Sequence, residues 1–405
     1  MNISRNCTSN KFVNRILLAV LLNLFCDDLL AANFYVRKSG NDGNSGTSPG
    51  TAWLTINKAA LLVGPGDTVY VGAGVYNEQV APKRNGTTSN PIRYIADTTG
   101  SQTGDAGTVE ITYAGTAVSV AQSDNVHFVG FQIRSSVRGV YWRQSQGGRI
   151  DSCEIYGNSD FGVEVDIAAV TVYNSIIRNN GSDGLYASGD SDVLVQLCEL
   201  RNNTGSGASG KGQKTKLTID RSRLYSNAID GVHSETGNFT FVNCLVYANG
   251  NDGVEVTLGS AASTIQFCTI AANGNDGIRQ QTGDMSISNC IVAFNAFGGL
   301  ERHNGTMTHS YNLVFGNTGG DFIGTTASTG EISVDPNFVS LAGRDFHLNR
   351  RSPAINAGTN SSPSVNVDLD GNSRPIGPTF DPGCYESKLG VNPTGLRVLS
   401  WKEIQ

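Results

Sequence analysis

The stretch Asn249-Gly250-Asn251-Asp252-Gly253 recurs 24 residues later as Asn273-Gly274-Asn275-Asp276-Gly277. Outward from this pair, one asparagine recurs every 22 to 24 residues over eight coils. Its positions are Asn158, Asn180, Asn203, Asn227, Asn249, Asn273, Asn295 and Asn317. Glycine stands four residues after each of the first seven. A repeat of this length is typical of stacked supersecondary units.

Short runs between these landmarks alternate in polarity. Examples are Phe239-Thr240-Phe241 and Val254-Glu255-Val256, and a period of two indicates strands with one buried face. A single coil cannot bury its apolar side, whereas stacked coils share one core. The sequence therefore predicts an all-β chain, a right-handed parallel β-helix or solenoid.

The recurring asparagine has two interpretations. It can form an internal ladder of amide hydrogen bonds, each satisfying buried polar groups that would otherwise cost ~1–3 kcal/mol. It can also be a residue that tolerates turn dihedrals. Both interpretations are kept open at this stage.

Cysteines follow the same period, and Cys244, Cys268 and Cys290 occupy one column in consecutive coils. In-register parallel strands point these side chains the same way, so a row of three cannot all form disulfides. We expect a buried stack of thiols that act as small apolar side chains.

The first 32 residues resemble an export signal. Lys11 and Arg15 precede the apolar run 16–25, and Ala31 and Ala32 follow it. The run is too short to span a bilayer, which needs ~20 residues. We expect bacterial export to a secreted or cell-surface location, with no transmembrane segment.

The remaining chain divides by its pattern. We expect an N-terminal cap with the first coils over 33–120, β-helix repeats over 121–322, C-terminal coils and a cap over 323–387, and a tail over 388–405. The amphipathic segment from Thr55 to Leu62 predicts a short helix that closes the N-terminal end.

The formal net charge of −6 and the pI near 5.4 argue against a nucleic-acid partner. An acidic ligand would need local cations on such a chain. We expect a monomer.

Both ends carry a family resemblance. Pro65-Gly66-Asp67-Thr68-Val69-Tyr70-Val71 and Gly74-Val75-Tyr76-Asn77-Glu78 resemble the N-terminal region of bacterial β-helix proteins, including pectate, alginate and chondroitin lyases. Asp335-Pro336-Asn337-Phe338, Ser352-Pro353-Ala354-Ile355 and Asp381-Pro382-Gly383-Cys384-Tyr385-Glu386 look like the C-terminal module of choice-of-anchor Q proteins. These resemblances imply a secreted or surface-displayed protein.

One outer face of the predicted solenoid is rich in titratable side chains. If the residue after each glycine of the repeat points inward, the next residue faces outward. That outward column reads Glu164, Tyr186, Ser209, His233, Glu255, Arg279 and Glu301. Lys211, Glu235 and His303 lie in the next outward column, and Asp183, Asp230, Asp252 and Asp276 precede their glycines.

The resemblance to calcium-dependent pectate lyases implies a site on this face. The positions that match their calcium ligands are Asp230, Asn251, Asp252 and Glu255, all of them oxygen donors. Those enzymes use a lysine base, but this chain has no lysine between Lys216 and Lys388, so Arg279 takes that role in the hypothesis, with His233 beside it. We predict an extracellular acidic polysaccharide as the substrate, contacted by Glu164, Tyr186, Lys211 and Glu301.

Three alternatives remain open. The first is a glycoside hydrolase that uses two of the carboxylates at Asp230, Asp252 and Asp276. In the second, these aspartates only form tight turns, and the protein is a non-catalytic, adhesin-like surface protein. The third concerns Trp142, which would either stack on a sugar ring or pack in the core.

Overall fold

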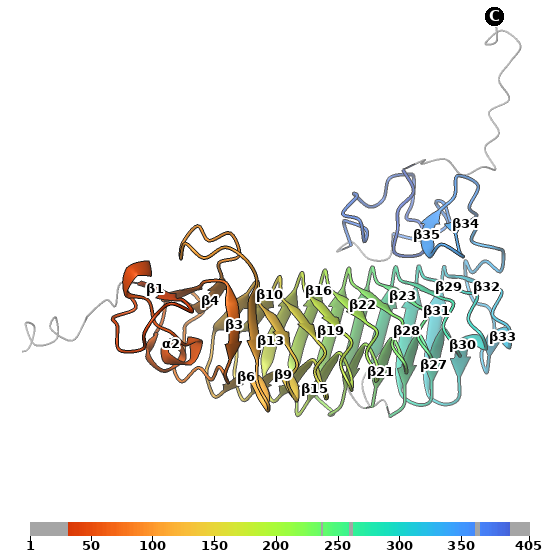
Figure 1. The fold of residues 1–405 in the computed structure, drawn as a ribbon. Coiled ribbons are helices and arrows are strands. Elements are labelled where there is room, and N and C mark those ends of the chain that lie inside the picture. The colour runs from red at the N-terminus through yellow and green to blue at the C-terminus, as the bar shows by residue number, and fades with distance from the viewer. Residues whose placement is uncertain (1–30, 236–237, 259–261, 361–364, 389–405) are drawn as a thin grey trace, which may run out of the picture.

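The computed structural model describes residues 31–235, 238–258, 262–360 and 365–388. They form an elongated rod of parallel strands with a smaller module against one side (Figure 1). Three long sheets, which we name A, B and C, run along the rod, and from Ile92 onward each coil passes through them in that order. Sheet B has 11 strands, so the solenoid has about 11 coils.

Sheet A contains β1 (Asn33–Val36), β2 (Thr68–Val71), β4 (Ile92–Ala96), β7 (Val126–Val129), β10 (Gly148–Asp151), β13 (Ala169–Tyr173), β16 (Asp192–Gln196), β19 (Lys216–Asp220), β22 (Asn238–Val242), β25 (Ser263–Gln266), β28 (Asp284–Ser288) and β31 (Thr306–Ser310). Sheet B contains β3 (Gly74–Asn77), β5 (Val109–Thr112), β8 (Gln132–Arg134), β11 (Glu154–Tyr156), β14 (Ile176–Arg178), β17 (Glu199–Arg201), β20 (Arg223–Tyr225), β23 (Leu245–Tyr247), β26 (Thr269–Ala271), β29 (Ile291–Ala293) and β32 (Leu313–Phe315). Sheet C contains β6 (Thr116–Ala121), β9 (Arg138–Arg143), β12 (Val163–Asp166), β15 (Leu185–Ser188), β18 (Ala208–Gly210), β21 (Val232–Ser234), β24 (Val254–Val256), β27 (Ile278–Gln280), β30 (Gly298–Arg302) and β33 (Gly320–Ile323).

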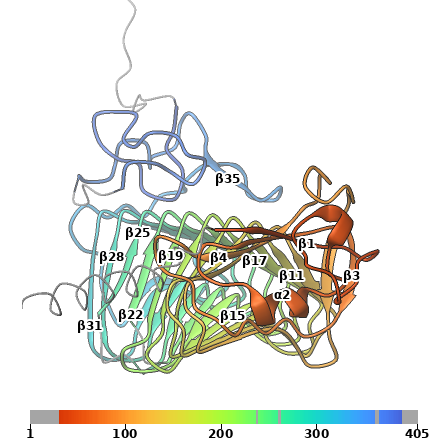
Figure 2. The ribbon, with the colours of Figure 1, turned by 90° about the vertical axis from the view of Figure 1, so that its left-hand side faces the viewer.

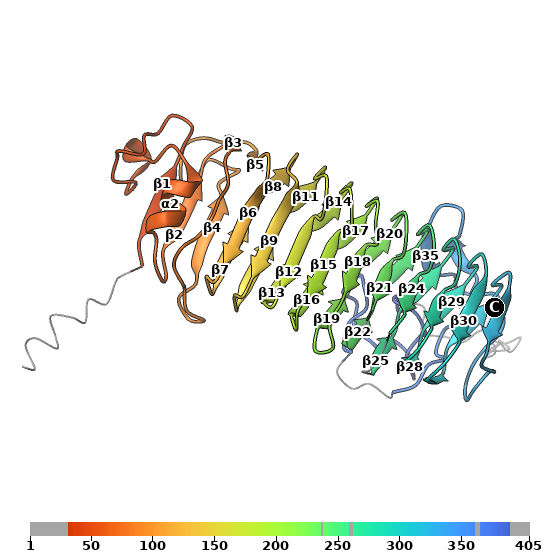
Figure 3. The same cartoon turned by 90° about the horizontal axis from the view of Figure 1, so that it is seen from below.

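Neighbouring strands pair in parallel and in register, as the repeat predicts. In sheet C, Val254 pairs with Ile278 and Glu255 with Arg279. Figure 3 shows these strands stacked along the rod. The predicted all-β parallel solenoid is confirmed, and equivalent residues of successive coils form straight columns along each face.

The core fills the inside of the coils. The residue after each glycine, such as Val163, Leu185 and Val232, is fully buried, which fixes the outward direction of the residue that follows. Trp142 is also completely buried and meets Phe128 edge to face. Of the two roles considered for Trp142, sugar stacking was wrong, because the indole packs inside the solenoid.

The asparagine column forms a continuous ladder at the turn from sheet B to sheet C. The Nδ2 of Asn249 donates to the Oδ1 of Asn273 at 3.0 Å and to the carbonyl of Leu224. The Oδ1 of Asn249 accepts from both the Nδ2 and the backbone N–H of Asn227. The same bond joins every step from Asn158 onward, and the last asparagine, Asn317, donates to Asp321.

Turn dihedrals do not explain this asparagine. None of the eight ladder residues has a positive φ; the left-handed conformation falls on the residue before, for example Asn179, Ser226 and Ala248. The ladder interpretation is therefore confirmed, and the hydrogen bonds are the reason for the residue type.

The thiol column is buried as expected. All six cysteines in the described part of the chain are free and buried, and the backbone N–H of Cys244 lies 3.5 Å from the sulfur of Cys268. Burial raises the pKa of both thiols well above the ordinary value, so they remain protonated.

A short helix covers the N-terminal end. After the 3-10 turn η1 (Pro49–Thr51), helix α2 (Ile56–Leu62) is capped at its N-terminus by Thr55, whose hydroxyl accepts from the N–H of Lys58. The carboxylate of Glu78 accepts from the N–H groups of Ile56 and Asn57. Ile56 is buried against the core, so the predicted cap helix is present. Within the described residues, no helix has the length and apolar character needed to cross a membrane.

The C-terminal segment differs from the expected stack of further coils. After a last partial coil, in which Ile332 pairs with Leu313, the chain turns back along the outside of the rod (Figures 1 and 2). Its only described strands, β34 (Phe338–Ser340) and β35 (Asp345–Leu348), form an antiparallel hairpin.

We call residues 335–388 the side module. Phe346 and Ile355 of the module pack against Leu245 and Ile291 on the outer face of sheet B. Of the predicted signal segment 1–32 and the predicted tail 388–405, residues 1–30 and 389–405 lie outside the described residues.

Candidate functional site

Sheet C carries the outward column that the sequence predicts, in register from coil to coil. Ser209 pairs with His233, His233 with Glu255, Glu255 with Arg279, and Arg279 with Glu301. Adjacent strands lie ~4.8 Å apart, so charged side chains in this column contact their neighbours directly.

The aspartates before the glycines have a turn function. The Oδ1 of Asp230 accepts from the backbone N–H of Asp252 and from the amide of Asn251. Asp252 makes the same two bonds to Asp276 and Asn275. One oxygen of each carboxylate is thus used for the turn of the next coil, and the second oxygen points toward the outward column.

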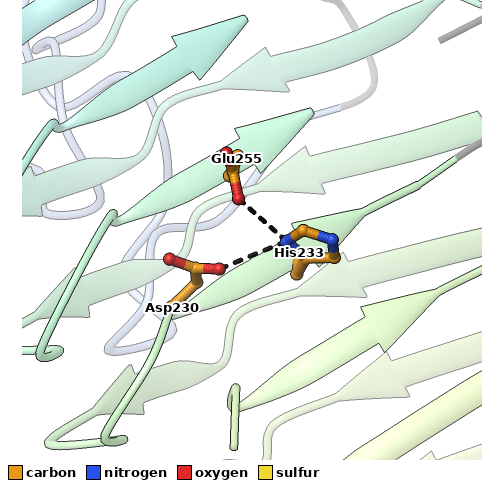
Figure 4. A group of neighbouring side chains, drawn as sticks. All are labelled: Asp230, His233 and Glu255. Atoms are coloured by element: carbon orange, nitrogen blue, oxygen red, sulfur yellow. Dashed lines mark hydrogen bonds and ion pairs between the residues drawn. The ribbon is translucent and has the colours of Figure 1, made fainter. Parts of the chain in front are cut away.

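His233 lies between two carboxylates, those of Asp230 and Glu255 (Figure 4). Its Nδ1 is 3.3 Å from the Oδ2 of Asp230, in the same coil, and 3.0 Å from the Oε2 of Glu255, in the next. Hydrogen bonds to Asp230 and Glu255 raise the pKa of His233 to about 10. The contact with His233 in turn lowers the pKa of Glu255. His233 is therefore an imidazolium at neutral pH, and its Nε2 has no hydrogen-bond partner among the described residues.

Arg279 lies among three carboxylates. Its guanidinium is 3.6 Å from Glu255, 3.4 Å from Glu301 and 3.9 Å from the Oδ2 of Asp252. That Oδ2 is fully buried and accepts no hydrogen bond from the described residues. Burial raises the pKa of Asp252 and that of Asp276 to about 7. This geometry suits Arg279 to balancing charge, and it does not suit the role of a free base.

A pocket of about 200 Å³ opens beside the free side of His233. Tyr186 and Ile229 give it apolar walls, and Asp183 and Ser209 line it together with His233. The hydroxyl of Ser209 donates to the Oδ2 of Asp183, and burial raises the pKa of Asp183. The pocket therefore combines a cation, a carboxyl group of raised pKa and an apolar surface.

The other predicted contact residues fall into two groups. Tyr186 lines the pocket with its ring stacked on Phe161, and Lys211 forms an ion pair of 2.7 Å with Glu235, which also lines the pocket. Glu301 lies beyond Arg279, and Glu164 lies in an earlier coil, 2.9 Å from Arg138. Tyr186 and Lys211 thus adjoin the pocket, whereas Glu164 and Glu301 lie on either side of it along the sheet.

The four predicted calcium ligands have other partners. Calcium takes about six to eight oxygen ligands. Here Asp230 bonds the next turn and His233, Asn251 donates its amide to Asp230, and Glu255 is shared between His233 and Gln281. Because the imidazole of His233 lies between the carboxylates of Asp230 and Glu255, these residues do not present the set of free oxygens that calcium needs.

Two important residues were not among the predicted site residues. Asp183 belongs to the titratable face that the sequence predicts, but it was given no role in the predicted site, although it lines the same pocket as His233. Gln281 was not singled out, yet its Nε2 donates to Glu255 at 2.7 Å. Asp183 was recognisable as the first of the aspartates before a glycine; Gln281 has no comparable sequence signal.

Comparison with known proteins agrees with this architecture. The family model described as "Right handed beta helix region" matches residues 116–265 and 212–339, together more than half of the chain. This chain belongs to the right-handed β-helix family. No curated protein matches the sequence of this β-helix protein.

Two solved structures share the fold of the β-helix protein over most of its length. Pectate lyase Pel9A is 17% identical, with a TM-score of 0.64, over 88% of this chain and 96% of its own. XylC, crystallised in complex with xylose, is 11% identical, with a TM-score of 0.63, over 88% of this chain and 99% of its own. At these identities the likeness concerns the fold.

Proposed function

We propose that this β-helix protein cleaves an acidic extracellular polysaccharide by β-elimination at the pocket beside His233. The observation that carries the proposal is the position of His233, which lines the pocket while its Nδ1 lies between the carboxylates of Asp230 and Glu255. A fold shared with a pectate lyase supports polysaccharide as the class of substrate.

A uronate residue has the chemistry that this pocket would recognise. Its carboxylate would accept a hydrogen bond from Nε2 of His233, a charge-assisted bond stronger than a neutral one. Tyr186 and Ile229 would cover the C–H face of the sugar ring. Lys211, which pairs with Glu235, would meet the carboxylate of a neighbouring sugar.

Elimination requires a base for the proton beside the uronate carboxylate. Asp183 lies in the same pocket, and its raised pKa makes its carboxylate a stronger base than an exposed one. The proton at C5 passes to Asp183, the C4–O bond breaks, and a double bond forms between C4 and C5. His233 stabilises the charge that develops on the uronate carboxylate in this step. The leaving oxygen takes a proton from solvent.

Arg279 has a positioning role in this scheme. It contacts Glu255, which in turn holds His233. The base predicted from the sequence is thus replaced in the proposal by Asp183, while His233 keeps a catalytic role.

The test is to incubate the protein from residue 33 with polygalacturonate, alginate and chondroitin, each with calcium and with EDTA. Elimination produces unsaturated uronate ends, which absorb in the ultraviolet. We expect activity on one of the three that EDTA leaves unchanged, and a loss of about 100-fold or more in Asp183→Asn. Asp276→Asn is the matched control, since it alters the same turn position outside the pocket. Absence of ultraviolet signal on all three glycans would overturn the lyase proposal.

A second candidate, a glycoside hydrolase, is favoured by one observation. Asp252 has a pKa raised to about 7 and Glu255 a lowered pKa, and both lie within 4 Å of the same Arg279 nitrogen. Carboxyl groups whose pKa values differ in this way are typical of an acid and a nucleophile or base. New reducing ends without ultraviolet absorbance would support the hydrolase, and glycan binding without any cleavage would support the adhesin-like alternative.

Export and surface display are part of the same proposal. The signal-like segment up to residue 32 and the likeness of the side module to choice-of-anchor Q proteins support them. Two residues of that likeness form hydrogen bonds inside the module: the N–H of Glu386 donates to Asp368, and Asp381 accepts from the N–H of Asn356. We propose a monomer that is secreted or held at the cell surface.

A further inference from the structure

A second groove lies on sheet A, away from the pocket of sheet C. It has a volume of about 490 Å³. Its floor is the outer face of β16, β19, β22 and β25, and one wall is residues 365–367 of the side module. Three steps between these four strands correspond to ~14 Å along the rod, so the groove is elongated.

Polar groups without partners line this groove. The hydroxyls of Thr218 and Thr240 and the amide of Gln266 have no hydrogen-bond partner among the described residues. Asn243 is only 2% exposed, and its Nδ2 donates to the carbonyl of Val367 at 2.8 Å. Its Oδ1 is buried and accepts no hydrogen bond from any residue that the structure describes. A buried acceptor left unpaired costs about 1–3 kcal/mol, so a ligand donor at this position is favoured.

The charges in the groove cancel. Asp220 is 3.0 Å from Arg221 and accepts from the amide of Gln196 at 2.7 Å. Leu194 and Val242 place aliphatic surface between the polar groups. An anionic ligand would meet only a cation that is already paired, whereas an uncharged ligand meets free donors and acceptors.

We propose that this groove binds a neutral oligosaccharide. Sugar hydroxyls both donate and accept, so one chain can satisfy the Oδ1 of Asn243 and also the hydroxyls of Thr218 and Thr240. Its C–H faces pack on Leu194 and Val242, and its length suits a floor of four coils. The groove and the pocket lie on different sheets, so binding here does not depend on cleavage at His233.

Calorimetric titration of the protein from residue 33 with cellohexaose, xylohexaose and mannohexaose tests this proposal. Tetragalacturonate and an uncharged extended peptide serve as competing ligand classes. We expect one of the neutral hexasaccharides to bind, with at least tenfold weaker affinity in Thr240→Trp, which fills the floor. Gln266→Ala removes one free amide with little risk to the fold and should weaken binding measurably.

Ser286→Trp is the matched control. Ser286 continues the column of Thr240 and Thr264 in the next coil but lies outside the groove, so this variant should bind like the wild type. Any cleavage of acidic glycan should be unchanged in Thr240→Trp. The proposal is overturned if no neutral hexasaccharide binds, if Thr240→Trp and Gln266→Ala both bind like the wild type, or if the peptide or tetragalacturonate binds more tightly.

Discussion

His233 and Glu255 contact each other across two adjacent coils, with Nδ1 of the histidine 3.0 Å from Oε2 of the glutamate. The parallel register of sheet C places the two residues opposite each other. Together with Asp230, Glu255 holds His233 as a cation on a face that otherwise carries mostly carboxylates.

The stability that His233 contributes should depend on pH. Its pKa is raised to about 10 in the folded protein, against about 6.5 when unfolded. Its contribution is therefore complete below pH ~6.5 and is lost as the pH rises through about 10. The difference in urea midpoint between wild type and His233→Gln should be largest near pH 6 and small near pH 10. A difference that is constant across this range would contradict the imidazolium.

The protein should gain a calcium site when the positively charged side chain of His233 is replaced by a carboxylate. The wild type should show no calcium binding by calorimetry, because His233 occupies the space between Asp230 and Glu255. His233→Asp replaces a cation with a further oxygen donor, and this variant should bind calcium and be stabilised by it. His233→Asn is the neutral control and should bind calcium more weakly. Calcium binding by the wild type that His233→Asp leaves unchanged would refute this assignment.

Asn249→Ala should destabilise the rod. The change leaves the Nδ2 and the N–H of Asn227 without their acceptor and removes the donor to Asn273. Unsatisfied buried groups of this kind cost ~1–3 kcal/mol each, so the free energy of unfolding should fall by at least that amount. Urea unfolding followed by circular dichroism measures it. Asn77→Ala, at an exposed asparagine, is the control, and an equal effect of both changes would argue against the ladder.

Glu386→Ala should loosen the side module. Arg374 and Glu386 form an ion pair of 3.0 Å with both side chains almost fully buried, and Arg374 also lies over the ring of Phe267. Removing the glutamate leaves a buried charge unpaired, which costs ~3–5 kcal/mol.

Limited proteolysis of the side module measures this change, and Glu386→Ala should be cut much faster than the wild type. Asp190→Ala breaks the exposed pair with Lys214, which should contribute no more than ~1 kcal/mol, so its cleavage rate should stay near that of the wild type. Equal cleavage rates for Glu386→Ala and the wild type would show that the ion pair does not hold the module.

The fold was predictable because its determinants are local and periodic. The spacing from Asn249 to Gly253 sets the turn, and the alternation after Gly253 puts Val254 inside and Glu255 outside. The course of the chain after Ile323 was not predictable in this way. The module packs on the side of sheet B through contacts such as Phe346 with Leu245, which have no period in the sequence.

The sequence predicts which face of the solenoid carries the site, but it does not predict the role of each side chain on that face. The outward column brought His233, Glu255 and Arg279 together, as the register requires. Their roles depend on which oxygen each carboxylate uses for its own turn. Asp230 bonds the following turn with Oδ1 and His233 with Oδ2, and residue spacing cannot separate these two functions.

The asparagine ladder also gives the rod a net dipole along its axis. Every side-chain bond runs the same way, from Nδ2 of one coil to Oδ1 of the next, so the amide dipoles add along the axis as peptide dipoles add in an α-helix. The positive end of this row is at Asn317, and the group that receives its last N–H is the carboxylate of Asp321. A solenoid built in this way is polarised from end to end, and its last coil is neutralised by a fixed anion, much as an acidic residue neutralises the first turn of a helix.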